Sequence, residues 1–396
     1  MTSDLPLPQK SLNTPLARLI AEQIQEAGPI SFRDFMELAL YHPELGYYNR
    51  SHTRLGKAGD FYTSSHVGPL FGWTIGRAIE KLLAAGENSA AGGPRGSKRP
   101  RKPLLIVEFG AGEGFLAKDV LEYFQHLSPS LFERVQYVIV EQSPALRRAQ
   151  TRLFDQNPDL QKRVRWCTAD ELEPFSGVVL ANEFADALPF HRVVLTDDGY
   201  REIFVDLREG GFVEKLGMIS SPRVDALIHE VEVEFEESWD SPWPVGQQAE
   251  ISIDAADWIG SLSERMERGR VVIIDYGDKA GKLYSYPPSQ GTVRAFYQHR
   301  VSNRYYEHVG EQDLTADVNF SLLLKAAVGH GFEEPELSTQ AEFLLENEIL
   351  KVVEDREGAL HLPQEEARNA RRQILNLTLP EMMGTRFKVL TLRRGI

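Results

Sequence analysis

The sequence predicts an α/β protein with a doubly wound parallel sheet, preceded by a helical segment and interrupted by an insertion. Leu104–Phe109 is an apolar run that ends in a glycine turn, and a helix follows from Phe115. Tyr137–Glu141 is a second short apolar run, which ends in an acid. Further apolar runs alternate with helical segments downstream, which is typical of parallel strands joined by helical crossovers.

Residues 1–85 are expected to be an N-terminal segment made mainly of helices. Asn13 or Thr14 is suited to cap the first helix, and Ser31 the second. A polar loop opens at Gly59-Asp60-Phe61, and a third helix is expected around residues 70–83.

Residues 86–103 are rich in Gly, Pro and Ser, and we expect them to form a flexible linker. Residues 104–396 are then the core domain. The strands expected in it are 104–109, 137–141, 164–167, 178–181, 271–275 and 387–392. An insertion of about residues 193–268 has hairpin turns at Asp198-Gly199 and Gly210-Gly211, and we expect it to form a lid over the carboxyl edge of the sheet.

Composition narrows the class of protein. The 396 residues carry 44 basic and 58 acidic side chains, a net charge of −14, which disfavours broad contact with a nucleic acid backbone. Cys167 is the sole cysteine, so neither an intramolecular disulfide nor a cysteine-based zinc site is possible. No apolar run has membrane-spanning length, and Met1–Asn13 lacks the features of a signal or transit peptide, so we expect a cytoplasmic enzyme.

The glycine turn after residue 109 is the first candidate binding element. Glycines at 110, 112 and 114 allow a sharp turn and a close approach of the backbone to a ligand. Position 115, where a dinucleotide-binding motif has its third glycine, is Phe. At the end of the second strand, Glu141 is placed to accept both hydroxyl groups of a ribose. The structural alternatives are an ordinary strand-to-helix turn and a solvated strand end.

The segment after the fourth strand is the candidate for binding a cationic substrate. Asn182 supplies a carbonyl oxygen, and Glu183 and Asp186 supply carboxylates. Carboxylates hold an amine or a guanidinium by charge-assisted hydrogen bonds, with Glu183 the first choice and Asp186 the second. Alternatively, the two acids cap the following turn or pair with Arg192.

His299 is a candidate general base, because an unperturbed histidine titrates near neutral pH. A hydrogen-bonded structural histidine is the alternative that the pattern favours. No clustered spacing suggests a metal site, and neither a nucleophile elbow nor a phosphate-binding loop is present.

These blocks together resemble MidA-like S-adenosylmethionine (SAM)-dependent methyltransferases. That family includes mitochondrial complex I assembly factors that methylate a protein arginine. Matching blocks are spread over nearly the whole chain from about residue 28 to residue 393. They include Gly28–Phe32, Tyr41-His42-Pro43, Gly59-Asp60-Phe61, Glu108–Gly114, Ala181–Pro189, Asp275-Tyr276-Gly277, Gly291-Thr292 and Gln312–Thr315.

The chain departs from the family pattern in loops that are expected to face the methyl acceptor. Ser65-His66 and Trp73 stand where the family has Pro-Glu and a second Glu, and Ala111 replaces the usual proline of the glycine loop. Arg304-Tyr305-Tyr306 replaces an Asp-Pro element. These changes leave SAM binding intact in our interpretation, and they bear on the identity of the acceptor.

The resemblance implies a class I SAM-methyltransferase fold and a specific placement of the cofactor. The methionine end is expected over the 110–114 loop, the ribose on Glu141, and the adenine near residues 166–170, with Asp170 as the acceptor for its amino group. Glu108, the acid that precedes the loop, is also assigned to cofactor binding. Loop residues assigned to cofactor binding are Gly110, Ala111, Gly112 and Gly114, together with Asn182 at the fourth strand. Asp60, Thr63 and Ser64 are expected to close over the cofactor from the N-terminal segment.

The function that the resemblance implies is N-methylation of an arginine in a protein substrate. One alternative is a methyltransferase for a small molecule, since the lid and the altered loops leave room for one. The other is a SAM-binding assembly factor that docks on a client with little turnover. The sequence leaves the oligomeric state open, a homodimer included, and it gives no indication of nucleic acid or membrane partners.

Overall fold

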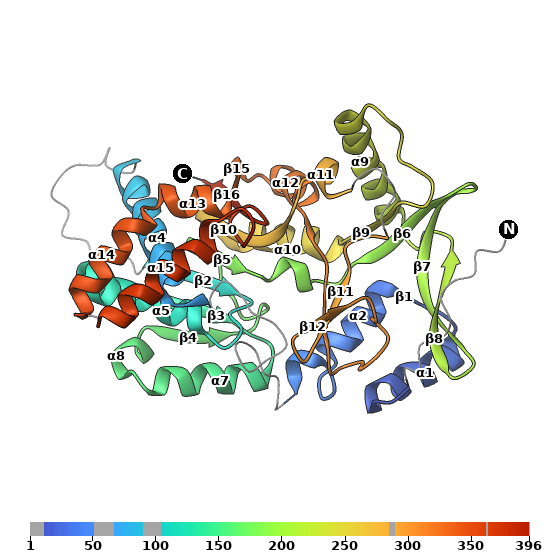
Figure 1. The fold of residues 1–396 in the computed structure, drawn as a ribbon, viewed down its shortest axis with the longest axis horizontal. Coiled ribbons are helices and arrows are strands. Elements are labelled where there is room, and N and C mark those ends of the chain that lie inside the picture. The colour runs from blue at the N-terminus through green and yellow to red at the C-terminus, as the bar shows by residue number, and fades with distance from the viewer. Residues whose placement is uncertain (1–11, 51–66, 90–103, 285–289, 362, 396) are drawn as a thin grey trace. The chain divides into compact units, whose positions relative to one another are not determined.

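The computed structural model describes residues 12–50, 67–89, 104–284, 290–361 and 363–395, with only the backbone described for residues 85–89, 364 and 367. The chain forms two compact units (Figure 1). The first consists of residues 1–61, 185–259 and 277–326, and the second of residues 62–184, 260–276 and 327–396. Among the described helices, none combines the length and the apolar character that a membrane crossing requires.

The second unit is built on the expected doubly wound sheet, which confirms the predicted fold class. Its strand order is β15-β16-β10-β5-β2-β3-β4. The strands are β2 (Leu104–Phe109), β3 (Val135–Val140), β4 (Val164–Cys167), β5 (Phe175–Asn182), β10 (Met266–Asp278), β15 (Glu333–Thr339) and β16 (Phe387–Arg394). The five strands from β4 to β10 pair in parallel. The edge strands β16 and β15 pair antiparallel, which the sequence pattern does not reveal.

Helices connect and surround these strands. They are α4 (Pro69–Ser89), α5 (Phe115–Leu127), α6 (Pro129–Phe132), α7 (Pro144–Asp155), α8 (Pro158–Gln161), α13 (Gln340–Glu346), α14 (Ile349–Leu360) and α15 (Gln364–Thr378). Helix α4 packs against α5, α14 and α15. At the start of α7, the hydroxyl of Ser143 accepts a hydrogen bond from the Leu146 amide at 3.2 Å and caps the helix.

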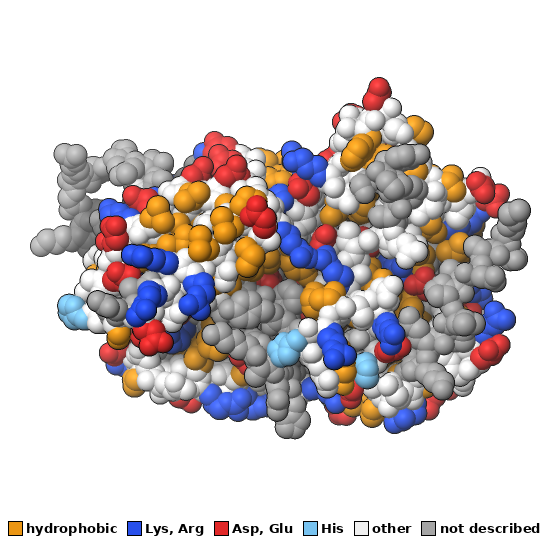
Figure 2. Space-filling model, in the orientation of Figure 1, with side chains coloured by type: hydrophobic (Ala, Val, Ile, Leu, Met, Phe, Trp, Pro, Cys, Tyr) orange, Lys and Arg blue, Asp and Glu red, His pale blue; other side chains and the backbone are white. Residues whose placement is uncertain are grey.

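The C-terminal helices carry several large apolar side chains on the surface. Figure 2 shows apolar side chains gathered over this part of the second unit. The exposed ones on α13, α14, α15 and the turn after α15 are Leu345, Leu350, Leu375, Leu379 and Met382.

The first unit contains two small antiparallel sheets. The larger has the order β1-β7-β6-β9, with β8 also paired to β7, and the smaller has the order β12-β11-β13. The strands are β1 (Ile30–Ser31), β6 (His191–Thr196), β7 (Gly199–Arg208), β8 (Gly211–Gly217), β9 (Gln248–Ile251), β11 (Arg294–Tyr297), β12 (Arg300–Ser302), β13 (Asp313–Thr315) and β14 (Val318–Asn319). β14 pairs in parallel with Gly277-Asp278 at the end of β10.

The helices of the first unit include the two expected at the N-terminus. They are α1 (Pro15–Ala27), α2 (Phe32–Tyr41), η1 (Tyr47–Asn49), η2 (Ala185–Ala187), α9 (Pro222–Trp239) and α11 (Ala280–Leu283). Helices α10 (Ile253–Arg265) and α12 (Phe320–Gly329) begin in the first unit and end in the second. Two predicted caps are confirmed: Thr14 accepts a hydrogen bond from the Ala17 amide, and Ser31 one from the Asp34 amide.

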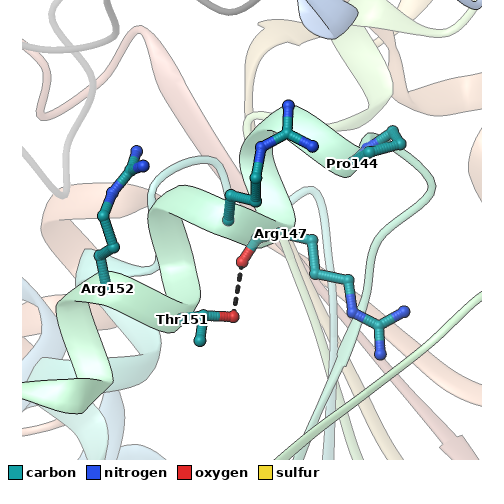
Figure 3. A pocket seen from close by; sticks show the side chains of 5 residues that line it. Pro144, Arg147, Thr151 and Arg152 are labelled. Atoms are coloured by element: carbon teal, nitrogen blue, oxygen red, sulfur yellow. Dashed lines mark hydrogen bonds between the residues drawn. The ribbon is translucent and has the colours of Figure 1, made fainter.

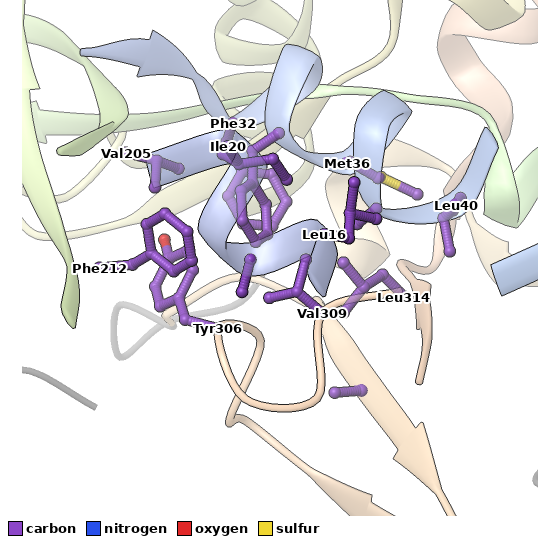
Figure 4. Close-up of a cluster of buried hydrophobic side chains, with 14 of the residues drawn as sticks. Leu16, Ile20, Phe32, Met36, Leu40, Val205, Phe212, Tyr306, Val309 and Leu314 are labelled. Atoms are coloured by element: carbon purple, nitrogen blue, oxygen red, sulfur yellow. The ribbon is translucent and has the colours of Figure 1, made fainter. Parts of the chain in front are cut away.

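An apolar core joins the N-terminal helices to the sheets of the first unit. Figure 4 shows Leu16, Phe32 and Phe212 among the side chains of this core. The cluster draws on α1, α2, β7, β8 and the segment around β13, so residues nearly 300 positions apart in the sequence pack together. In the same region, the Thr14 hydroxyl donates a 2.8 Å hydrogen bond to the Val309 carbonyl.

The division into units differs from the expected domain bounds at three places. Helix α4 packs on α5 in the second unit, although residues 1–85 are expected to form one segment. The strands and hairpins of the expected insertion are present, but the first unit takes in 185–259 and also 277–326. α4 extends to Ser89, and residues 90–103 of the expected linker lie outside the described residues.

Candidate cofactor site

The carboxyl ends of the three parallel strands β2, β3 and β5 lie side by side in the sheet. Phe109 pairs with Val140 on one side and with Ala181 on the other, so the residues that follow these three lie side by side. Those residues are Gly110, Glu141 and Asn182, all predicted from the sequence. The connections turn in opposite directions at β2 and β5, which makes this edge the switch point where ligands bind in doubly wound folds.

The glycine turn between β2 and α5 has a backbone that side chains disfavour. Gly110, Gly112 and Gly114 have φ values of 69°, 53° and 91°. A Cβ atom at Gly110 would come within 2.9 Å of the Phe184 side chain. The turn is closed by a 2.8 Å bond from the Gly114 amide to the Ala111 carbonyl. This backbone leads into the N-terminus of α5, a suitable place for a ligand carboxylate.

Glu141 is held by hydrogen bonds to both of its carboxylate oxygens. Oε1 accepts from the Ser143 amide at 2.7 Å, and Oε2 accepts from Nε2 of Gln150 at 3.0 Å. Burial raises the pKa of Glu141, and these hydrogen bonds act in the opposite direction. The carboxylate is therefore fixed in orientation at the end of β3, as a group that binds ribose hydroxyls requires.

Asn182 and Glu183 form the end of β5. Asn182 is 8% exposed, and its Oδ1 has no hydrogen-bond partner among the described residues, whereas its Nδ2 donates to Glu183 at 3.3 Å. Glu183 has a φ of 50°, a conformation that non-glycine residues adopt at a cost. Its amide donates to the Ile274 carbonyl at 2.8 Å, which anchors the turn to β10. A buried carbonyl oxygen without a donor is suited to receive one from a ligand.

Two other predicted cofactor residues in the second unit have different surroundings. Glu108 is buried and accepts a 2.8 Å hydrogen bond from the Tyr137 hydroxyl, and burial raises the pKa of Glu108 to about 7. Asp170 is exposed in the turn after β4. Near it, Trp166 is half-buried, and its Nε1 donates to Gln150 at 2.9 Å.

Asp186, in the first unit, lines a partly open pocket with two further acids. The pocket has apolar walls formed by Leu188, Phe190 and neighbouring residues, and it also contains Glu250 and Asp317. Glu250 is buried and accepts hydrogen bonds from the amide and the hydroxyl of Thr292, at 2.8 and 3.0 Å. Burial raises the pKa of Glu250.

His299 lies at the tip of the β11–β12 hairpin, where it is exposed. Gln298 and His299 have φ values of 48° and 63°, so a two-residue turn normally built from Asn and Gly is made here by two larger residues. Next to the turn, Tyr297 stacks on His308 with ring centroids 3.9 Å apart. The predicted residues Asp60, Thr63 and Ser64 lie outside the described residues.

A separate, open pocket lies on the outer face of α7. Pro144, Arg147, Arg148, Thr151 and Arg152 line it, and Figure 3 shows their arginine side chains spreading apart along the helix. The arginine side chains do not converge on one point, so they do not form a binding site for a single anionic group. Within the described part of the chain, no group of three His, Cys, Asp or Glu side chains is arranged to hold a metal ion.

Sequence reasoning missed Gln150 and Glu250. Gln150 is fully buried on α7, nine residues beyond Glu141, and bonds to Glu141, to Trp166 and to the glycine turn. Nothing in a helical run of Ala, Leu, Arg and Gln marks one glutamine as buried. Glu250 lies in an acidic stretch of the sequence, and only its proximity to Gly291-Thr292 distinguishes it.

Comparison with known proteins places this geometry in a family. The SAM-dependent methyltransferase family model Methyltransf_28 matches residues 94–335. "Protein arginine methyltransferase NDUFAF7, mitochondrial" of Danio rerio is 31% identical over 80% of this chain and 73% of its own length. The Drosophila melanogaster homologue is 28% identical over 96% and 85%.

A solved structure resembles the whole chain. The crystal structure of a COG1565 superfamily protein from Burkholderia thailandensis, bound to S-adenosyl-homocysteine, superposes with a TM-score of 0.82. It is 30% identical, and the match covers 99% of this chain and 96% of that one. The family match, the relatives and the sheet topology agree: this chain belongs to the Methyltransf_28 family of SAM-dependent methyltransferases.

Proposed function

We propose that this methyltransferase transfers the methyl group of SAM to a nitrogen of an arginine in a protein substrate. Two relatives that match most of this chain in sequence are named protein arginine methyltransferases. The observation that carries the proposal is the pair Asn182 and Glu183 at the end of β5. This pair lies next to the end of β2, where the glycine turn begins. A guanidinium is a planar donor that a carboxylate and a carbonyl oxygen together recognise.

In the placement that we propose, the cofactor lies along the carboxyl ends of the parallel strands. The glycine turn receives the methionine end of SAM, Glu141 receives the ribose, and the adenine lies towards Trp166 and Asp170. The positive φ of the turn glycines fits a ligand that approaches the backbone closely. Glu108 lies within β2, two residues before the turn, and accepts a hydrogen bond from the Tyr137 hydroxyl; in this placement it supports the turn and does not contact the cofactor.

SAM supplies an activated methyl group on a sulfonium. The work of the protein is therefore to orient the acceptor nitrogen and to exclude water. We propose that Glu183 holds the guanidinium and accepts the proton that leaves the nitrogen during transfer. Asp186 and His299, both in the first unit, remain candidate residues for acceptor binding and proton removal, and their variants belong in the same assay.

The test of this proposal is methyl transfer from tritiated SAM into protein, with Glu183→Gln as the variant. Glu209→Gln is the matched control, because Glu209 is an exposed glutamate with a similar φ of 52° in the β7–β8 turn. We expect label in protein that hydrolysis releases as methylarginine, about a 100-fold lower kcat for Glu183→Gln, and retained SAM affinity. Label in a small extractable product would favour a metabolite as acceptor. SAM binding without label in either fraction would favour an assembly factor.

We further propose a cytoplasmic location and no nucleic acid or membrane partner; the net charge of −14 disfavours binding to a nucleic acid backbone. The names of the relatives place those proteins in mitochondria. A homodimer is the oligomeric state we propose to examine first, by sedimentation of the purified chain. Fractionation of the source cells tests the location.

A further inference from the structure

One buried side chain connects the predicted parts of the cofactor site. Gln150 lies on α7 and is 0% exposed. Its Nε2 donates both to the Gly112 carbonyl at 2.7 Å and to Oε2 of Glu141 at 3.0 Å, and its Oε1 accepts from Nε1 of Trp166 at 2.9 Å. The two amide donors and the amide oxygen are therefore all engaged.

These contacts permit only one orientation of the amide. If it were reversed, its oxygen would face the Gly112 carbonyl and the Glu141 carboxylate, and its NH₂ group would face the indole N–H of Trp166. Each of those contacts would be repulsive. The stem of Gln150 also supports the glycine turn, since a Cβ atom at Gly114 would lie 3.4 Å from its Cγ.

We propose that Gln150 is the positioning residue of the cofactor site, which couples the glycine turn that binds the methionine end to the acid that binds the ribose. The inference rests on the proposed cofactor placement. Gln150 does not contact SAM itself in this proposal. It acts through Glu141, whose second carboxylate oxygen it fixes, and through the carbonyl of Gly112, which sets the path of the turn.

The three partners of Gln150 belong to different parts of the sheet: Gly112 follows β2, Glu141 follows β3, and Trp166 lies within β4. Because the Gln150 amide is hydrogen-bonded to all three, it fixes the position of the glycine turn relative to Glu141 and Trp166. The expected consequence is that SAM, which reaches both the turn and Glu141, depends on Gln150 more strongly than 5′-methylthioadenosine does. That analogue keeps the ribose and lacks the amino-acid end.

The experiment is calorimetric titration of the full chain with SAM and with 5′-methylthioadenosine. The variants are Gln150→Leu, Glu141→Gln and the double variant, with Gln156→Leu as the control, because Gln156 is exposed at the end of the same helix. We expect Gln150→Leu to weaken SAM binding about 10- to 100-fold, the range for a lost hydrogen bond to a charged group. The loss should be smaller for the analogue, and in the Glu141→Gln background it should be much reduced.

Gln150→Glu keeps the shape of the side chain and is the second variant, in case Gln150→Leu fails to fold. A carboxylate at this position repels Glu141 when ionised and can donate one hydrogen bond when protonated. Its SAM affinity relative to the unaltered protein should therefore recover as the pH is lowered from 8 to 5. The recovery should be larger for SAM than for 5′-methylthioadenosine, whereas a merely structural role would affect both ligands alike.

The outcomes separate this inference from the cofactor placement on which it rests. Glu141→Gln weakening SAM binding while Gln150→Leu binds normally would overturn the role of Gln150 and leave the placement standing. Equal losses from Gln150→Leu in both backgrounds, or for both ligands, would also overturn it. Normal SAM binding in Glu141→Gln and Gln150→Leu alike would overturn the placement together with the inference.

Discussion

At the scale of single residues, Gly112 tests whether the glycine turn binds the cofactor. Its φ of 53° disfavours a β-branched side chain, and any side chain here would obstruct a close ligand. We expect Gly112→Val to lose measurable SAM binding in a calorimetric titration. The control is Gly199→Val at the first residue of β7, where φ is 95° and a Cβ atom meets nothing within 4 Å. Unchanged affinity in Gly112→Val would place SAM elsewhere.

Glu108 makes stability depend on pH. Burial raises the pKa of this carboxyl in the folded protein to about 7, from 4.5 in the unfolded chain. The stability that its protonated form provides is present in full below pH 4.5 and is lost as the pH rises through 7. Glu108→Gln stays neutral and keeps an acceptor for Tyr137.

Glu108→Gln should therefore gain stability over the unaltered protein between pH 4.5 and about 7, by roughly 3 kcal/mol in total. Denaturant unfolding at pH 5 and pH 8 measures this difference, with Glu133→Gln at an exposed position as the control. If Glu108→Gln raised the free energy of unfolding equally at both pH values, the raised pKa of Glu108 would be contradicted.

The residues that could be predicted are those whose chemistry is visible in a local pattern. Gly110 and Glu141 follow apolar strands directly, so the sequence places them at the sheet edge, and the register confirms it. Gln150 could not be predicted, because its role comes from bonds to Gly112 and Trp166 that only the folded sheet brings near.

At the scale of elements, two glycines set the distance between α4 and α5. Gly72 and Gly76 lie four residues apart on α4, and a Cβ atom at Gly76 would come within 2.7 Å of the Tyr123 ring on α5. We expect Gly76→Ala to destabilise the protein by about 1–3 kcal/mol through overpacking.

The control for this prediction is Gly358→Ala in α14, where a Cβ atom meets nothing within 4 Å. Because alanine favours the helix, this variant should be stabilised by about 0.5–1 kcal/mol. Denaturant unfolding of both variants measures the two changes. Stabilisation of Gly76→Ala as well would show that the close packing of α4 on α5 is not required.

Elements with strong local signals were predicted, and those that depend on distant partners were not. The caps at Thr14 and Ser31 are local and are confirmed. The hairpin expected around Asp198-Gly199 is present, but its two turn residues are Asp197 and Asp198, and Gly199 begins β7. Strand β15 was missed because its residues are mostly exposed and polar, and only pairing with β16 makes it a strand.

At the scale of the whole molecule, the cofactor segments identified all belong to the second unit. Binding of S-adenosylhomocysteine should slow hydrogen exchange at the glycine turn, around Glu141 and in the turn after β4, because binding opposes local opening. The exposed β7–β8 turn of the first unit serves as an internal reference. Protection confined to the first unit would contradict the assignment of the cofactor site to the second.

The division of the chain is the feature that sequence patterns predicted least well. Each unit is assembled from three separate stretches, and the core that joins Leu16 to Leu314 has no local signature. The alternation that identifies a doubly wound sheet is local, so the second unit was predictable. The first unit combines short antiparallel strands with helices, and their grouping follows from tertiary packing.

The most direct test of this account is calorimetric titration of the purified chain with SAM and with S-adenosylhomocysteine, repeated with Glu141→Ala. We predict micromolar binding of both ligands to the unaltered protein and its loss in Glu141→Ala, since this change removes the carboxylate that receives the ribose in our proposal. Absence of binding to either ligand would contradict the cofactor site itself. Full binding in Glu141→Ala would show that the ribose lies elsewhere.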